Sequence, residues 1–176
     1  YVTVAKQIAT KHGVAIDMPA GPSELLVMAD DSAKASFVAS DLLSQAEHGP
    51  DSQVILVSTS TEFMNKVEGE VENQLKELPR KDIAKKAIAN SKLIYVGKPQ
   101  EAIDLINEYG PEHYILCVAD ETPYIENVLN AGSVFIGNYT PESAGDYASG
   151  TNHTLPTNGY AKQYSGVNLD SFTKSM

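Results

Sequence analysis

Glu112 and His113 are adjacent in this 176-residue sequence and stand directly before an apolar segment. A histidine with a pKa near ~6.5 can take a proton from an alcohol or a hydrated aldehyde, and a partly buried glutamate whose pKa is raised toward ~6 can activate water. Neighbouring side chains on a strand point to opposite faces, so the pair can serve one substrate only from the loop that enters the strand, which Pro111 favours. A salt bridge at a strand edge explains the pattern equally well.

Gln45 and His48 lie near the predicted end of a helix, which Gly49 and Pro50 terminate. Their spacing places both on one helix face together with Asp41. A neutral imidazole and an amide oxygen can act as metal ligands. A histidine that interacts with the helix dipole, beside a solvated glutamine, is the simpler interpretation, and spacing alone does not decide between the two.

Two further segments carry polar side chains that could contact a ligand. Asp146 follows Gly145, where the backbone can turn sharply and direct a carboxylate inward, and Glu142 and His153 are further candidates nearby. Asx turns account for much of this segment, and we expect His153 to be a loop histidine bonded to backbone. Ser23 lies in a turn rich in proline and glycine, either as a turn former or as a hydrogen-bond donor to a ligand.

The apolar pattern predicts the elements that must position these residues. Short continuous apolar runs at 25–29, 54–57, 93–96, 114–118 and 134–136 are typical of buried parallel strands. Amphipathic segments of helical length lie between them, at 34–48, 61–78, 81–90, 100–109 and 122–130, and residues 3–12 resemble the end of another helix. This alternation predicts an α/β fold with a mostly parallel sheet flanked by helices, Rossmann-like but incomplete.

Residues 138–166 show no apolar period and predict a long irregular polar loop near the C-terminus. We divide the chain into residues 1–22, the end of a preceding domain or a crossover segment, residues 23–168, an α/β domain that binds substrate and metal, and residues 169–176, the start of a truncated segment. The chain does not begin with methionine, which also suggests a piece of a longer protein.

Composition excludes several classes of partner. With 13 Lys and Arg against 23 Asp and Glu, the formal charge is −10, and no basic stripe is present, so nucleic acid is not an expected partner. No run approaches the ~18 apolar residues of a membrane span. Cys117 is the single cysteine, which excludes an internal disulfide and favours the cytoplasm. The glycine-rich dinucleotide motif and the P-loop are both absent.

Four parts of the sequence nevertheless carry distinctive strings, at 16–24, at 41–49, at 111–113, and at 139–157. In order and content these strings resemble the histidinol dehydrogenase family. The resemblance implies NAD-dependent oxidation of L-histidinol through L-histidinaldehyde to L-histidine, the last step of histidine biosynthesis, with Zn²⁺ positioning the substrate. It implies Gln45, His48 and Asp146 as zinc ligands that also contact the substrate.

The same resemblance assigns the remaining site residues. Glu112 and His113 match the two proton acceptors, His113 also contacts the substrate, and Ser23 matches a serine that binds the substrate. Full-length members are longer and are expected to act as homodimers. Their N-terminal region supplies much of the NAD site, so the NAD-binding residues are unknown here, and a C-terminal segment supplies another histidine ligand from the other subunit.

Two expectations follow from the difference between this chain and the longer family members. With three of the zinc ligands, this chain alone should bind metal weakly and should be inactive. The alternative from another class is a non-catalytic module with the same fold that binds a small ligand through a metal. Two adjacent proton acceptors argue against it, because a binding module has no use for them.

Overall fold

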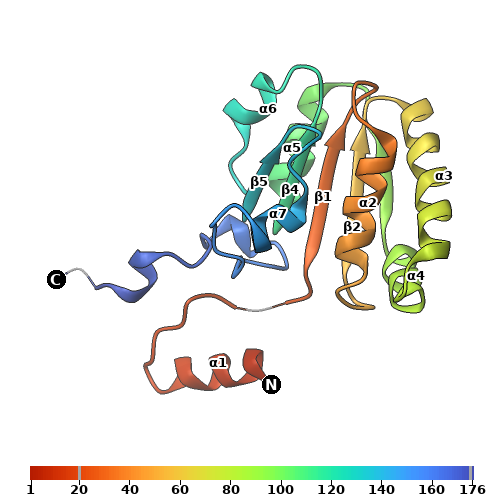
Figure 1. Ribbon diagram of the computed structural model, residues 1–176. Helices are drawn as coiled ribbons and strands as arrows, with labels where there is room; N and C mark the ends of the chain where they lie inside the picture. The colour runs from red at the N-terminus through yellow and green to blue at the C-terminus, as the bar shows by residue number, and fades with distance from the viewer. Residues whose placement is uncertain (20, 175) are drawn as a thin grey trace.

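The computed structural model describes residues 1–19, 21–174 and 176, and its centre is an open sheet of five parallel strands (Figure 1). The strands follow the spatial order β3-β2-β1-β4-β5, which is the order of a Rossmann-type sheet. Their bounds are β1 Glu24–Ala29, β2 Gln53–Ser58, β3 Lys92–Tyr95, β4 His113–Cys117 and β5 Ser133–Ile136. The predicted α/β fold with a parallel sheet is confirmed.

Helices cover both faces of the sheet. α2 (Ala35–Ala46), α3 (Thr61–Glu77) and α4 (Lys81–Ala89) pack on one face, and α5 (Pro99–Tyr109) and α6 (Thr122–Asn127) pack on the other. β1 serves both cores, because Leu25 and Val27 point into the first and Leu26 and Met28 into the second. All four are fully buried, which explains why this strand is an unbroken apolar run.

The two outer strands differ from the expectation of buried strands. Leu93 and Tyr95 of β3, and Val134 and Ile136 of β5, are all exposed by more than a third. Both strands form the edges of the sheet, so each has one neighbour only. Apolar content alone does not tell an edge strand from a central one.

The segment predicted as an irregular loop contains regular structure. A short helix, α7 (Glu142–Tyr147), follows β5, and the 3₁₀ turn η1 (Tyr160–Lys162) comes later in the same segment. A second 3₁₀ turn, η2 (Leu169–Phe172), lies after the predicted loop. α7 packs against α2. Gly145 lies inside α7 and not in a sharp turn, and a Cβ there would lie only 2.9 Å from Cζ of Phe135. The glycine permits α7 to approach β5 closely.

The N-terminal helix α1 (Val2–Lys11) lies apart from the sheet, below the amino ends of the strands in Figure 1. None of its residues is buried. Lys6 joins it to the following segment through Asp17, at 2.7 Å, and through the carbonyl oxygen of Met18, at 3.0 Å. The division at residues 22 and 168 stays a prediction. Among the residues that the structure describes, none of the helices combines the length and apolar character that crossing a membrane requires.

Candidate active site

The candidate site lies at the amino edge of the sheet, where the parallel strands begin. His113 is the first residue of β4 and Glu112 precedes it, which confirms that the pair stands at the entrance to a strand. α2 connects β1 to β2 and therefore runs back to this edge, where it ends two residues before His48. α7 returns from the far end of β5 in the same way and brings Asp146.

Glu112 and His113 form a buried pair with a third carboxylate beside them. Nε2 of His113 lies 3.5 Å from Oε1 of Glu112 and 3.9 Å from Oε1 of Glu142. All three side chains are buried, and Glu142 is only 1% exposed. The ring of Phe135 on β5 lies 6.0 Å from the His113 ring, centre to centre. The imidazole is therefore enclosed by two carboxylates and an aromatic ring.

The electrostatics of this group raise the proton affinity of His113. Burial opposes the charged ring, but the hydrogen bond with Glu112 and the charges of Glu112, Glu142 and Asp146 outweigh it, so the pKa of His113 is raised above its ordinary value. A histidine in this setting is a stronger base than a free one and holds the proton that it accepts.

Glu142 is fixed to α2 by two contacts. Its Oε2 accepts a hydrogen bond of 3.2 Å from Oγ of Ser44, and its backbone N–H donates to Oδ1 of Asp41 at 3.3 Å. Burial and, to a smaller degree, the charge of Glu142 raise the pKa of Asp41 to about 6, against the lowering effect of that backbone hydrogen bond. Sequence reasoning named Glu142 only as a further candidate, and the structure places it at the centre of the site.

A cluster of possible metal ligands lies next to His113. His48, Glu142 and Asp146 each offer one ligand atom, and these atoms all lie within 4.8 Å of one another. Nδ1 of His48 faces the carbonyl oxygen of Ser44 at 3.1 Å, which leaves Nε2 available. A cavity of about 240 Å³ adjoins them and is lined by Ser44, Glu47, His48, Arg80, Glu142, Ser143, Asp146 and Tyr147. Two of the three predicted zinc ligands, His48 and Asp146, are thus brought together.

Gln45 is fully buried, so the interpretation of a solvated glutamine is wrong. Neither Oε1 nor Nε2 of its amide has a hydrogen-bond partner among the described residues. Buried polar atoms in folded proteins nearly always have partners, and an unpaired amide costs about 1–3 kcal/mol. Gln45 lies one helical turn before His48, and its unpaired amide is therefore suited to bind a metal ion or a ligand there.

Ser23 and His153 lie outside this cluster. Ser23 lines a separate polar cavity of about 450 Å³ at the same edge, together with Pro22, Glu24, Asp51, Gln53, Glu108, Tyr109, Asn158, Gly159 and Lys162. Ser23 shares the amino edge of the sheet with Glu112 because Glu24, the next residue, donates its N–H to Oε2 of Glu112 at 3.3 Å. His153 is exposed in the loop after α7.

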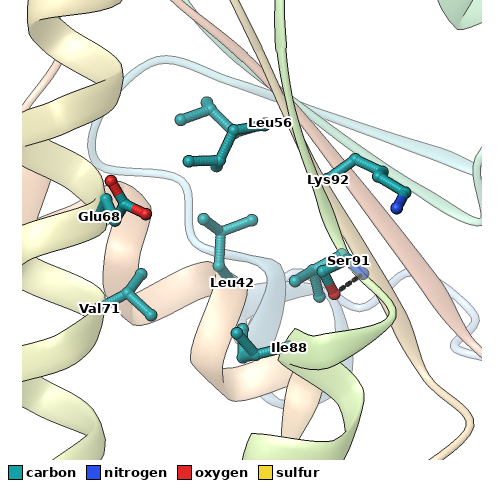
Figure 2. Close-up of a pocket in the computed structure, with 9 residues that line it drawn as sticks. Leu42, Leu56, Glu68, Val71, Ile88, Ser91 and Lys92 are labelled. Atoms are coloured by element: carbon teal, nitrogen blue, oxygen red, sulfur yellow. Dashed lines mark hydrogen bonds between the residues drawn. The ribbon is translucent and has the colours of Figure 1, made fainter.

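An apolar cavity of the domain lies in another place. It has a volume of about 220 Å³ and lies between the sheet and α2, α3 and α4, as Figure 2 shows. None of the predicted site residues lines it; the lining consists of Leu42, Val54, Leu56, Glu68, Val71, Ile88, Ser91, Lys92 and Leu93. It is a gap in the packing of the core and contains no candidate acid or base of the site.

The usual ligand position of such a sheet carries an acidic side chain. Ligands of open parallel sheets generally bind at the carboxyl ends of the strands, where the strand order reverses, which here lies between β1 and β4. At this point Oδ2 of Asp30 accepts a hydrogen bond from the N–H of Ala119, at 2.9 Å, and the N–H of Asp30 donates to the carbonyl oxygen of Cys117. The acidic side chain of Asp30 therefore joins the segments that follow the two strand ends.

The fold and the site define a parallel α/β protein in which a buried glutamate–histidine pair lies beside a cluster of possible metal ligands. Over residues 1–176 the chain matches the family model described as histidinol dehydrogenase. The chain belongs to the histidinol dehydrogenase family.

Individual relatives agree with this assignment. A histidinol dehydrogenase of Bacteroides fragilis strain YCH46 is 61% identical over 176 residues, which is 100% of this chain and 41% of the relative. The histidine biosynthesis trifunctional protein of Saccharomyces cerevisiae is 55% identical over 179 residues, covering 99% of this chain and 22% of that protein. The crystal structure of histidinol dehydrogenase from Elizabethkingia anophelis superposes with a TM-score of 0.94 at 59% identity, covering 97% of this chain and 40% of that one. The chain therefore spans about 40% of the length of its bacterial relatives.

Proposed function

We propose that this chain forms the substrate- and metal-binding part of an NAD-dependent histidinol dehydrogenase, which oxidises L-histidinol through L-histidinaldehyde to L-histidine. The observation that carries the proposal is the buried pair of Glu112 and His113 next to the cluster of His48 and Asp146. A reaction of two successive oxidations with a hydration between them needs a base for hydroxyl protons and an activator of water. The pair offers one of each.

The two proposed proton acceptors divide the work according to their chemistry. In the first oxidation His113 takes the proton of the substrate hydroxyl group, and its raised pKa suits it to hold that proton. Glu112 then takes a proton from the water that adds to the aldehyde. In the second oxidation His113 takes a hydroxyl proton of the hydrate. NAD⁺, when bound, accepts a hydride from the reacting carbon in each oxidation.

Gln45, His48 and Asp146 would hold zinc. The buried amide of Gln45 without a hydrogen-bond partner fits an additional ligand, and imidazole nitrogen and carboxylate oxygen are both donors that zinc accepts. Zinc, when bound, supplies a fixed positive charge that holds the polar groups of the substrate in place. Ser23 would contact the substrate from the neighbouring cavity.

The rest of the enzyme would supply the dinucleotide site. The acidic, hydrogen-bonded edge at Asp30 disfavours a pyrophosphate at the carboxyl ends of these strands. We therefore propose that NAD⁺ approaches the amino edge from parts of the protein outside these 176 residues, and that the complete enzyme is a homodimer in the cytoplasm.

A chimera tests this proposal. The chain replaces the matching segment of the Bacteroides fragilis relative, and the purified chimera is assayed for NAD⁺ reduction with L-histidinol. We expect two NADH per L-histidinol consumed, with L-histidine as product, and a loss of about 10²-fold or more in kcat for His113→Asn. Failure of the chimera to oxidise L-histidinol, although it folds and dimerises like its parent, would contradict the proposal.

The substitution Glu112→Gln separates the two proton acceptors. With L-histidinaldehyde as substrate, the variant should lose activity more strongly than it does in the first oxidation, because only the aldehyde must be hydrated. Glu126→Gln on the exposed face of α6 is the matched control and should behave like the unmodified chimera. Equal losses in both half-reactions would contradict the assigned role of Glu112.

A further inference from the structure

Glu142 is a buried carboxylate that none of the steps above uses. It is 1% exposed, and among the described residues His113 is its one ion-pair partner, at 3.9 Å. Burying a carboxylate without a compensating charge is energetically unfavourable, so the position of Glu142 beside the imidazole calls for a specific role.

The surroundings of Glu142 fix its carboxylate in place. Oε2 accepts the hydrogen bond from Ser44, and the backbone N–H at the start of α7 is held by Asp41. Oε1 is left to face Nε2 of His113. A residue anchored at both backbone and side chain keeps its charge at a constant position relative to the ring.

We infer that Glu142 is a positioning residue for His113, whose carboxylate orients the imidazole and stabilises the positive ring that forms when His113 takes a proton. The inference rests on the proposed function, because it assigns a role in the same acid–base chemistry. It follows the logic by which a buried carboxylate orients a general-base histidine in other enzymes. The raised pKa of His113, to which the charge of Glu142 contributes, agrees with this geometry.

The test uses Glu142→Gln in the chimera. Glutamine retains an oxygen that can accept the hydrogen bond from Ser44, but it removes the charge beside His113. We expect kcat for L-histidinol to fall about 10-fold or more, with KM within about 2-fold and the zinc content of the protein unchanged. Glu142→Asp, which keeps the charge, should recover part of kcat, and Glu126→Gln should have no effect.

Two results would overturn the inference. A kcat within about 2-fold of the unmodified chimera would show that the charge has no role in turnover. Loss of zinc in parallel with kcat would make Glu142 a metal ligand and not a positioning residue.

A spectroscopic measurement on the 176-residue chain separates this inference from the proposed function. The ¹⁵N shifts of the His113 ring report how much of it is positively charged at a given pH. Glu142→Gln should lower that fraction near neutral pH, whether or not the chimera oxidises L-histidinol. Unchanged ¹⁵N shifts would contradict the inference even if the chimera is fully active.

Discussion

The backbone N–H of Glu24 donates a hydrogen bond of 3.3 Å to Oε2 of Glu112, and so the first residue of β1 holds the carboxylate that precedes β4. The side chain of Glu24 has its own partners, because its two oxygens accept hydrogen bonds from the N–H groups of Asn158 and Gly159, at 2.9 and 3.2 Å. The buried Glu24 therefore connects Glu112, and with it the Glu112–His113 pair, to the C-terminal loop. Glu24 is also the group whose titration should be measurable in the folding equilibrium.

Burial raises the pKa of Glu24 to about 6, against the lowering effect of the two backbone hydrogen bonds and with a further increase from the charge of Glu112. In the unfolded chain its pKa is near 4.5, so between these values the native state keeps a proton that the unfolded state releases. The contribution of Glu24 to stability therefore falls as pH rises from 4.5 to 6 and is constant above. We expect Glu24→Gln to gain about 2 kcal/mol relative to the unmodified chain over this interval.

Urea unfolding at several pH values between 4.5 and 7 measures this difference. Glu126→Gln, an exposed substitution of the same kind, serves as the control and should keep a constant difference from the unmodified chain. A difference for Glu24→Gln that does not change with pH would contradict the prediction.

The unpaired amide of Gln45 should lower the free energy of unfolding when no metal is bound. Replacement by methionine, which has a similar volume, removes an amide whose two polar atoms are unpaired. We expect Gln45→Met to increase the free energy of unfolding of the chain by about 1–3 kcal/mol in the presence of a chelator. In the chimera the same substitution should lower zinc content and kcat together.

The control for Gln45 is Gln163→Met at an exposed position, which should leave both quantities unchanged. Destabilisation of the chelator-treated chain by Gln45→Met would show that its amide has partners in solution and would argue against a ligand role.

Gly132 should be required for the position of Glu112. Its N–H donates to the carbonyl oxygen of Pro111, and a Cβ at this position would lie 2.5 Å from the carbonyl oxygen of Glu112. We expect Gly132→Ala to destabilise the chain by roughly 1–3 kcal/mol, because the backbone before β4 must move. Thermal unfolding measures the change.

Gly69→Ala provides the matched comparison. Gly69 lies inside α3, and no atom of a neighbouring residue lies within 4 Å of the position of its added Cβ. Alanine should therefore stabilise the helix by about 0.5–1 kcal/mol. If both substitutions changed stability in the same direction, the steric argument for Gly132 would be wrong.

The chain alone should retain zinc poorly. It offers the three proposed ligands Gln45, His48 and Asp146, and two of these, His48 and Asp146, are exposed. Stable zinc sites normally have four good donors and low solvent access. After dialysis against a chelator, metal analysis should find fewer than about one zinc ion per ten chains. One zinc ion per chain would contradict this expectation.

The sequence predicted the alternation of strands and helices well because each element carries its own apolar period. It also placed Glu112 and His113 correctly, since the pattern marks the start of β4. It could not predict that β3 and β5 form the edges, because strand order depends on contacts between distant segments. The edge strands carry apolar residues as the central strands do, and only their exposure differs.

The roles of α7 and Glu142 were hidden for a related reason. Residues 142–147 have little intrinsic helical preference, and the helix depends on packing against α2 and β5. Glu142 and Ser44 are 98 positions apart, so no local spacing signals their contact. A solvated Gln45 was the simpler interpretation because a polar residue near a helix end usually is solvated. Its burial depends on contacts of α2 with distant segments, such as α7.

The proposed reacting groups lie at the starts of the strands, so the opposite end of the described sheet carries none of them. Its loops, such as residues 119–120, carry exposed side chains, and they lie a full strand length away from His113. Insertions there can be accommodated while α2, α7 and β4 keep their mutual spacing. Evolution can therefore remodel that end, or attach another module to it, at little cost to turnover.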